Sequence, residues 1–196
     1  PYNLAPTLRH YTYGLAEAGV GDAYLNSLRL AVATALLGTP FIFTTAYLLE
    51  KTGARGGRLA TAVQALAALP MGVPGLVLGI GCILFFNHPA NPLGGLYKTM
   101  ALMVLATVVH YYSACHLTAL TALKSLDREF EAVSASLKVP RWRTFWRVTL
   151  PVCLPAVLEI GRYLFINAMT TVSALVFLYA PHTLPASVSI LNLDEA

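Results

Sequence analysis

Four long apolar segments alternate with polar stretches along this chain. Each is long enough to cross a bilayer as a helix, because about 20 apolar residues at 1.5 Å per residue match a hydrocarbon core of about 30 Å. Pro40 predicts a kink in the first segment, and Pro70 and Pro74 predict breaks in the second. The pattern therefore predicts an all-α, polytopic bundle of about four membrane-spanning helices, at residues 27–49, 59–86, 99–120 and 152–179.

Composition agrees with a membrane setting. Of the 196 residues, 57% are hydrophobic and 11% are charged, and the mean hydropathy is +0.64, whereas about a quarter of the residues in soluble domains are charged. Cys82, Cys115 and Cys153 are isolated in apolar surroundings, which is typical of small buried residues rather than of a disulfide framework. Residues 1–19 lack the regions of a signal sequence, so we expect the chain to be an interior piece of a longer protein.

Basic residues concentrate in two of the polar stretches. Cytoplasmic loops of membrane proteins carry the excess of Lys and Arg, and four crossings place both stretches on that same face. The stretch at 87–97 has no basic residue, so we expect it outside, together with the N-terminal segment and the C-terminal tail. Nine of the 13 basic residues mark the predicted cytoplasmic face: Lys51, Arg55, Arg58, Lys124, Arg128, Lys138, Arg141, Arg143 and Arg147.

The polar stretch at about 121–151 is long for a connection between bundle helices, which usually takes about two to eight residues. Most of it reads "REFEAVSASLKVPRWRTFWRVTLP", in which good helix formers are followed by Pro140, a predicted break. After the break, Trp142 and Trp146 lie one turn apart on one face, and Pro151 suits the first turn of the next membrane helix. Two interpretations remain open: an amphipathic helix in the headgroup region, or a docking surface for a cytoplasmic partner.

The segment "EAVSASLKVPRWRTFWRVTLP" resembles the signature cytoplasmic loop in permease subunits of binding-protein-dependent ABC importers. "NSLRLAVATALLGTPFIFTTAYLLEK" resembles the second helix of that family, and "LPMGVPGLVLGIG" resembles the start of its third. Lys138 stands where the family has a Gly. The resemblance implies the type I importer permease (MetI-like) fold. Residues 1–196 would form one permease domain without the first and last helices of a six-helix core, and 121–151 would be its coupling loop.

The resemblance also implies partners and residue roles. We expect the coupling helices to sit in a cleft of a cytoplasmic ATPase subunit dimer, with Trp142, Phe145 and Trp146 as buried anchors. A substrate-binding protein on the outer side and a second permease half, either a separate subunit or a fused one, would complete the importer in the bacterial inner membrane. The expected ATPase-coupling residues are Glu131, Ala132, Leu137, Lys138, Trp142, Phe145, Trp146, Leu150 and Pro151.

The C-terminal half resembles permeases assigned to 2-aminoethylphosphonate import, which are related to ferric-iron and spermidine/putrescine permeases. Two interpretations stay open for its polar side chains: structural ion pairs and interhelical hydrogen bonds, or the lining of a translocation path. His110 and His116 point about 120° apart on a helix, so we expect no metal site, and no cofactor is expected. The candidate path residues are Glu159, Arg162, Asn167, Thr170, Thr171 and Ser173.

Enzyme motifs are missing from the sequence. It has no Gly-Lys-Ser/Thr phosphate loop, no nucleophile elbow and no zinc-protease helix motif. We therefore expect a non-enzyme whose transport is driven by ATP hydrolysis in a separate subunit, and no nucleic-acid partner. Two other classes stay open: an intramembrane enzyme that uses His110 or Glu159, and a purely structural membrane subunit.

Overall fold

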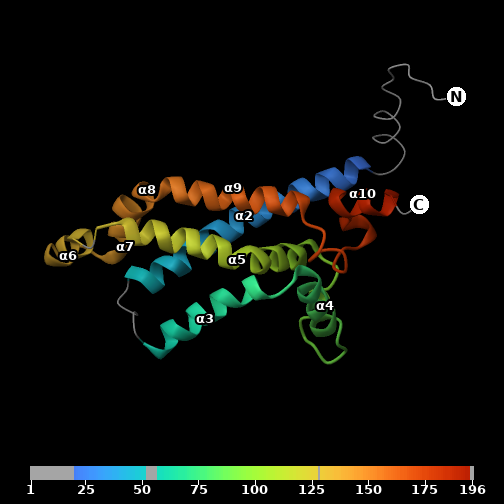
Figure 1. The fold of residues 1–196 in the computed structure, drawn as a ribbon, viewed down its shortest axis with the longest axis horizontal. Helices are drawn as coiled ribbons and strands as arrows, with labels where there is room; N and C mark the ends of the chain where they lie inside the picture. The colour runs from blue at the N-terminus through green and yellow to red at the C-terminus, as the bar shows by residue number, and fades with distance from the viewer. Residues whose placement is uncertain (1–19, 52–56, 128, 195–196) are drawn as a thin grey trace, which may run out of the picture.

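The computed structural model describes residues 20–51, 57–127 and 129–194. Every regular element in these residues is a helix, which confirms the predicted all-α class. Three long helices lie side by side and form the body of the molecule (Figure 1): α2 (Val20–Lys51), α5 (Met100–Ser125) and α9 (Leu154–Thr170). Among the described helices, α2 and α5 are each long and apolar enough to cross a membrane on their own.

A close approach of these three helices centres on Gly38 of α2. A Cβ atom at this position would lie 2.8 Å from Leu164 of α9 and 3.0 Å from Val108 of α5, so a larger residue would require these two side chains to shift. Small residues at such contacts let membrane helices pack closely. Along their contacts the three helices bury large apolar side chains: Leu30, Ile42, Phe43, Leu102, Met103, Leu123, Ile160 and Leu164.

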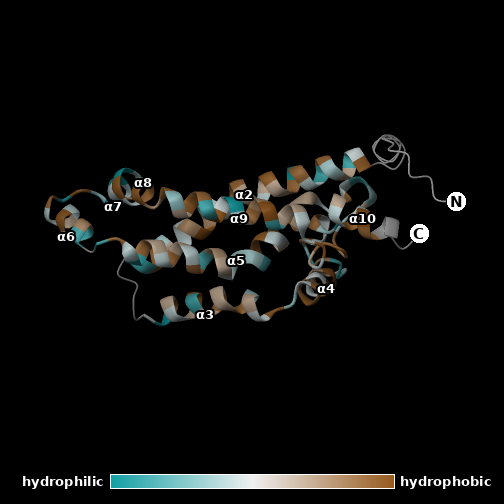
Figure 2. Cartoon of the chain, turned by 45° about the horizontal axis from the view of Figure 1, so that its top comes forward, coloured by the Kyte–Doolittle hydropathy of each residue, from teal (hydrophilic) through white to brown (hydrophobic). Residues whose placement is uncertain are grey.

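The outer faces of α2 and α5 are also apolar. Leu36 and Leu37 of α2 are 68% and 64% exposed, and Leu105 of α5 is exposed as well. Figure 2 shows hydrophobic residues on the outward sides of the helices as well as between them. A helix that is hydrophobic all round fits a lipid environment rather than water. α2 also continues without interruption through Pro40, so the proline predicted to kink this helix does not end it.

The second apolar segment forms two helices rather than one continuous span. α3 (Arg58–Gly72) and α4 (Gly75–Phe86) meet at an angle of 111°. Pro70 lies in the last turn of α3, and Pro74 directly precedes α4. The predicted break is confirmed, because a proline removes a backbone donor and disfavours helical geometry in the residue before it.

The fourth apolar segment is helical over a shorter range than predicted. The chain leaves α9 after Thr170 and forms turns, so the expected helix to residue 179 is wrong. At its other end α9 begins at Leu154, with Pro155 in its first turn. Pro151, expected in that first turn, lies instead in the short preceding helix α8 (Leu150–Val152).

The predicted coupling loop folds as short helices at one end of the molecule (Figure 1). α5 reaches Ser125, beyond its predicted end near residue 120. Then follow α6 (Glu129–Ser136), α7 (Arg141–Thr144), the π-helical turn η2 (Phe145–Thr149) and α8. The break predicted from Pro140 is confirmed, and the segment from α7 to α8 meets α9 at 73°.

The short elements η1 (Gly94–Leu96), η3 (Pro181–Thr183) and α10 (Ala186–Asp194) gather with α4 at the opposite end (Figure 1). The segment from η3 to α10 is tied to the first turns of α2. The Asn26 amide donates to the carbonyls of His182 and Leu184 at 3.0 and 3.3 Å, and the Ser27 hydroxyl accepts from the N–H of Ala186 at 2.8 Å. α2 therefore connects the two ends of the molecule.

The described basic residues of the predicted cytoplasmic face lie at the α6 end: Lys51 ends α2, Arg58 begins α3 and Lys124 lies in the last turn of α5. Residues 87–97 and the described part of the C-terminal tail, which were predicted to lie outside, are at the other end (Figure 1), and residues 1–19 of the N-terminal segment lie outside the described residues. Arg55 and Arg128, which also contributed to the predicted orientation, lie outside the described residues.

Gly75 allows α4 to begin directly against the turns that follow α9. A Cβ atom there would collide with the Ser173 hydroxyl and lie 3.2 Å from Cε1 of His110. We expect Gly75→Ala to lower the free energy of unfolding by about 1–3 kcal/mol, the usual effect of overpacking. Thermal unfolding of the purified protein measures the change.

Gly81→Ala is the matched control, because a Cβ at Gly81 meets no atom of the described residues within 4 Å. It should be neutral or stabilise α4 by up to about 1 kcal/mol, since Ala is the better helix former. Equal unfolding temperatures for the two variants would contradict the close contact at Gly75.

Candidate functional site

The end of α6 has the hydrogen bonds of a glycine-terminated helix although no glycine is present. Lys138 takes a left-handed conformation with a φ of 53°. Its N–H donates to the carbonyl of Ala135 at 3.1 Å, and the N–H of Val139 donates to that of Ser134 at 2.9 Å. These two bonds form a Schellman motif with Lys138 at the position that glycine usually takes. In the family that this segment resembles, a glycine stands at this position, and here a lysine makes the bend.

An ion pair ties α6 to the end of α2. Nζ of Lys51 lies 3.1 Å from Oε1 of Glu131, and the two residues are 80 positions apart in the sequence. The Lys51 side chain is only 6% exposed, and that of Glu131 is 29% exposed. A buried ammonium group without a partner is costly, so the position of α6 is linked to the charge of Lys51.

A pocket of about 410 Å³ lies beside this ion pair, between α2 and the α6–α7 connection. Tyr47 and Lys51 line it from α2, and Glu131, Val139 and Arg141 line it from the other side. α6 is thus joined to α2 mainly through polar groups around an open space. Such a joint can change its geometry at lower cost than a filled apolar core, which resists deformation.

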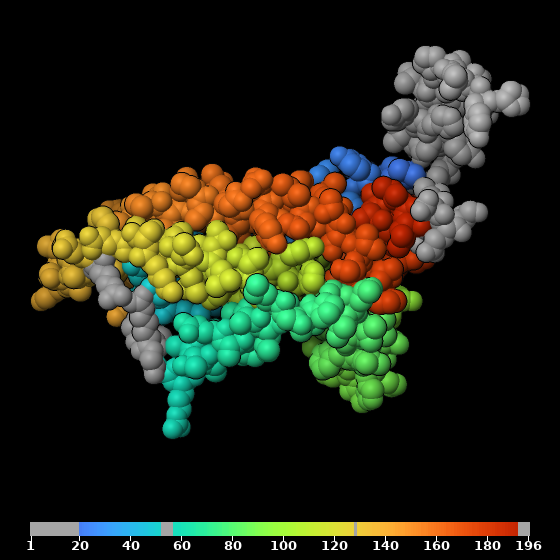
Figure 3. All heavy atoms as spheres, in the orientation of Figure 1, coloured from blue at the N-terminus to red at the C-terminus, as the bar shows by residue number. Residues whose placement is uncertain are grey.

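The aromatic residues of the coupling segment point in different directions. The Phe145 ring lies 4.7 Å from the ring of Tyr47 and 6.2 Å from that of Phe43, measured between centroids, so it packs against α2. Trp142 and Trp146 are 62% and 61% exposed. Figure 3 shows α6 and α7 projecting from this end of the molecule. The two tryptophans are therefore free to contact a partner, whereas Phe145 connects their segment to the helical body.

The other predicted coupling residues divide in the same way. Ala132, Leu137, Lys138 and Pro151 are exposed. Leu150 is partly buried and packs against the core, as Phe145 does. The structure thus brings the predicted set together on one short segment with an inner and an outer side. Tyr47 and Lys51 of α2 were missed, because their role depends on contacts with residues distant in sequence.

The candidate path residues do not form one cluster. Glu159 and Arg162 form an ion pair with N···O distances of 2.6 and 2.9 Å, and both side chains are exposed on the outer face of α9. The amide of Asn167 donates to the carbonyl of Tyr163, and the hydroxyl of Thr170 donates to that of Ile166. The predicted ion pair between Glu159 and Arg162 is therefore present, and the place of these residues on a translocation path stays a prediction.

Thr171 and Ser173, predicted to continue this helix, lie beyond its end. Thr171 is buried, and its carbonyl accepts a hydrogen bond from the Ser187 hydroxyl at 2.8 Å. Ser173 faces the beginning of α4 at Gly75. Thr171 therefore contacts α10 and Ser173 contacts α4, and neither residue extends the exposed face of α9.

Residues 38–195 match the family model described as "Binding-protein-dependent transport system inner membrane component". This chain belongs to that family. It is 31% identical over 193 residues to the ferric transport system permease protein FbpB of Actinobacillus pleuropneumoniae, covering 96% of this chain and 27% of the relative. It is also 31% identical over 171 residues to the molybdate/tungstate transport system permease protein WtpB of Thermococcus kodakarensis, covering 86% of this chain and 65% of the relative.

A putative ferric transport system permease protein FbpB 1 of Haemophilus influenzae is 30% identical over 185 residues, covering 92% of this chain and 28% of the relative. The chain thus spans about a quarter of the length of these two ferric relatives. The family match confirms the predicted permease fold. The matched residues, 38–195, include the second half of α2 and the coupling segment from α6 to α8.

Substitutions at Lys138 test the left-handed turn. Lys138→Gly should stabilise the end of α6, and Lys138→Val should weaken it, because a β-branched residue fits positive φ poorly. Each substitution should change the free energy of opening the end of α6 by about 1 kcal/mol. This corresponds to a change of about fivefold in the hydrogen-exchange rate of the α6 amides, which mass spectrometry measures. Identical exchange in all three proteins would show that this turn is not formed.

A double-mutant cycle tests the Lys51–Glu131 pair. Lys51→Met and Glu131→Gln should each destabilise the protein, since each leaves one partly buried charge unpaired. The double variant should recover part of the loss, with an interaction energy of about 1 kcal/mol after allowance for the exposure of Glu131. Unfolding midpoints of the four proteins measure it, and purely additive effects would exclude the pair.

Proposed function

We propose that this chain is the membrane-spanning permease part of an ABC importer, which moves a small solute across the inner membrane with ATP hydrolysed by a separate ATPase dimer. The family membership supports the transport role. The arrangement of the coupling end carries the proposal: two exposed tryptophans lie on a short segment that is joined both to α2 and to α9. Large exposed aromatics of this kind are typical anchors at protein interfaces.

The connections of this segment indicate how motion of the ATPase would reach the membrane helices. Phe145 packs on α2 through Tyr47 and Phe43. The segment Arg141–Val152 then leads directly into α9 through the 73° bend. A displacement of Trp142 and Trp146 would therefore be transmitted to α2 by packing and to α9 by chain continuity. Rigid helices in two arrangements are the physical basis of such coupling.

The partners and substrate follow as parts of the same proposal. A second permease half would complete the translocation path, and an outer binding protein would deliver the solute to the end formed by α4, η3 and α10. The resemblance discussed above makes 2-aminoethylphosphonate the first candidate solute. The names of the relatives add ferric iron and molybdate or tungstate as candidates.

Uptake assays test the proposal and separate its parts. Cells that lack only this permease gene should lose uptake of one labelled solute among 2-aminoethylphosphonate, ferric iron and molybdate, and the wild-type gene should restore it. The Trp146→Glu protein should insert into the membrane but restore no uptake, and it should lose the ATPase subunit on purification. A charge at an interface anchor costs at least about 2 kcal/mol, which lowers the affinity for the ATPase subunit about 30-fold.

Trp146→Phe is the matched control and should restore most of the uptake, since it keeps an aromatic ring at the same place. Full uptake by an inserted Trp146→Glu protein would exclude the coupling role of this residue. Loss of none of the three solutes in the deletion strain would contradict these substrates and favour another cargo, an intramembrane enzyme or a structural subunit.

A further inference from the structure

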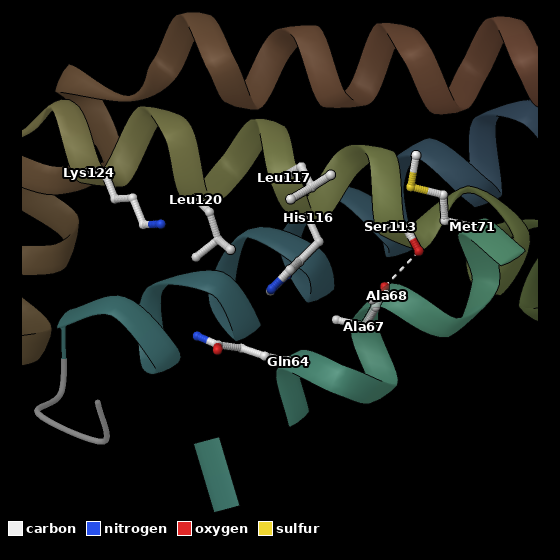
Figure 4. Close-up of a pocket in the computed structure, with 9 residues that line it drawn as sticks. All are labelled: Gln64, Ala67, Ala68, Met71, Ser113, His116, Leu117, Leu120 and Lys124. Carbon is white, nitrogen blue, oxygen red and sulfur yellow. Dashed lines mark hydrogen bonds between the residues drawn. The ribbon is translucent and has the colours of Figure 1, made fainter. Parts of the chain in front are cut away.

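A second pocket lies between α3 and α5, in the half of the molecule nearer the coupling end. Its volume is about 260 Å³. Alanine, leucine and methionine side chains form most of the wall, and Gln64, His116 and Lys124 supply polar groups (Figure 4). Because one water molecule takes about 30 Å³ in the liquid, the space suits a small solute or a single headgroup rather than one water.

His116 is the unsatisfied group in this pocket. It is 3% exposed, and neither of its ring nitrogens has a hydrogen-bond partner within the described residues. Its ring stacks on Tyr112, with centroids 5.3 Å apart and planes 18° apart, which fixes its orientation toward the pocket (Figure 4). A buried polar group left without a partner costs about 1–3 kcal/mol. A ligand that hydrogen-bonds to His116 would remove this cost.

The remaining polar groups of the pocket show what kind of ligand would suit it. The Ser113 hydroxyl already donates to the carbonyl of Ala67 at 2.6 Å. Gln64 offers amide N–H donors, and Lys124 offers a positive charge, while no residue that lines the pocket carries a carboxylate. Hydrogen-bond donors with a net positive charge select negatively charged oxygens. A ferric ion, as a hard cation, would instead require oxygen ligands such as carboxylates.

We propose that this pocket binds a tetrahedral oxyanion group, with His116 and Gln64 as hydrogen-bond donors and Lys124 as the charged residue. Phosphonates, molybdate and tungstate share this chemistry, and so does the phosphate of an anionic phospholipid. If the ligand is a free oxyanion, the site narrows the solute of the importer, and that part rests on the transport role proposed above. If it is a lipid phosphate, the site holds a structural or regulatory lipid.

Binding to the assembled transporter in nanodiscs distinguishes these sources. In the first arm, molybdate and 2-aminoethylphosphonate are titrated into transporter in discs of phosphatidylcholine alone. In the second arm, native mass spectrometry measures how much phosphatidylglycerol the transporter retains compared with phosphatidylcholine. His116→Phe keeps the stacked ring and should weaken the binding seen in one arm at least tenfold. Lys124→Gln, at an exposed position, should weaken it as well without affecting folding. Thr118→Val, at an exposed position of α5 that does not line the pocket, is the control.

Loss of oxyanion binding in both pocket variants assigns the site to a free solute, and loss of phosphatidylglycerol retention assigns it to a lipid. Unchanged binding in both arms would overturn the proposal and leave His116 as a core residue. The uptake assay separates this result from the transport role: normal solute uptake by His116→Phe with unchanged binding would contradict the pocket alone. If the protein binds an oxyanion at His116 but deletion of its gene affects no solute uptake, the transport role would be contradicted and the pocket proposal would stand.

Discussion

The close packing of α2 against α5 and α9 around Gly38 is the contact on which the rest of the structure depends. The absence of a side chain at Gly38 leaves room for Leu164 and Val108, which approach it from two helices at once. α2 is about 48 Å long at 1.5 Å per residue, so it extends past this contact at both ends. One end carries Lys51 and the aromatic contacts to Phe145, and the other carries Asn26. The helices of the coupling segment at one end, and η3 and α10 at the other, are thus attached to the same helix, α2.

The turns that follow α9 are covered by another part of the chain. In hydrocarbon an unpaired backbone group costs several kcal/mol, so breaks in a span are tolerated only when they are buried or reach water. The turns after α9 are mostly buried and the beginning of α4 packs against them, whereas residues 71–74 at the break between α3 and α4 are exposed. Gly75 lies against Ser173, and a Cβ at Gly79 would lie 3.1 Å from the carbonyl oxygen of Ala174. The first turns of α4 therefore cover the turns after α9, which come from a distant part of the sequence.

Local signals in the sequence were sufficient for the features that local geometry determines. Apolar length predicted the helical segments, proline predicted the breaks before α4 and α7, and a three-residue spacing predicted the Glu159–Arg162 pair. The end of α9 was missed because the apolar residues after Thr170 carry no helix-breaking residue before Pro181, and contacts with α4 and α10 determine their conformation. The inward position of Phe145 and the pairing of Lys51 with Glu131 also depend on contacts between distant segments, which no local pattern encodes.

The exposed ion pair on α9 indicates that this chain alone does not complete its membrane surface. Charged groups at the centre of a membrane helix cost about 2.5–3.5 kcal/mol each on insertion scales. Pairing Glu159 with Arg162 neutralises the charge, but the side chains remain 49% and 64% exposed. Lipid is a poor environment for that face, whereas the apolar outer faces of α3 and α4 suit lipid or another helix. A polar neighbour suits this face of α9 better than lipid does, and the second permease half proposed above would supply one beside a water-filled path.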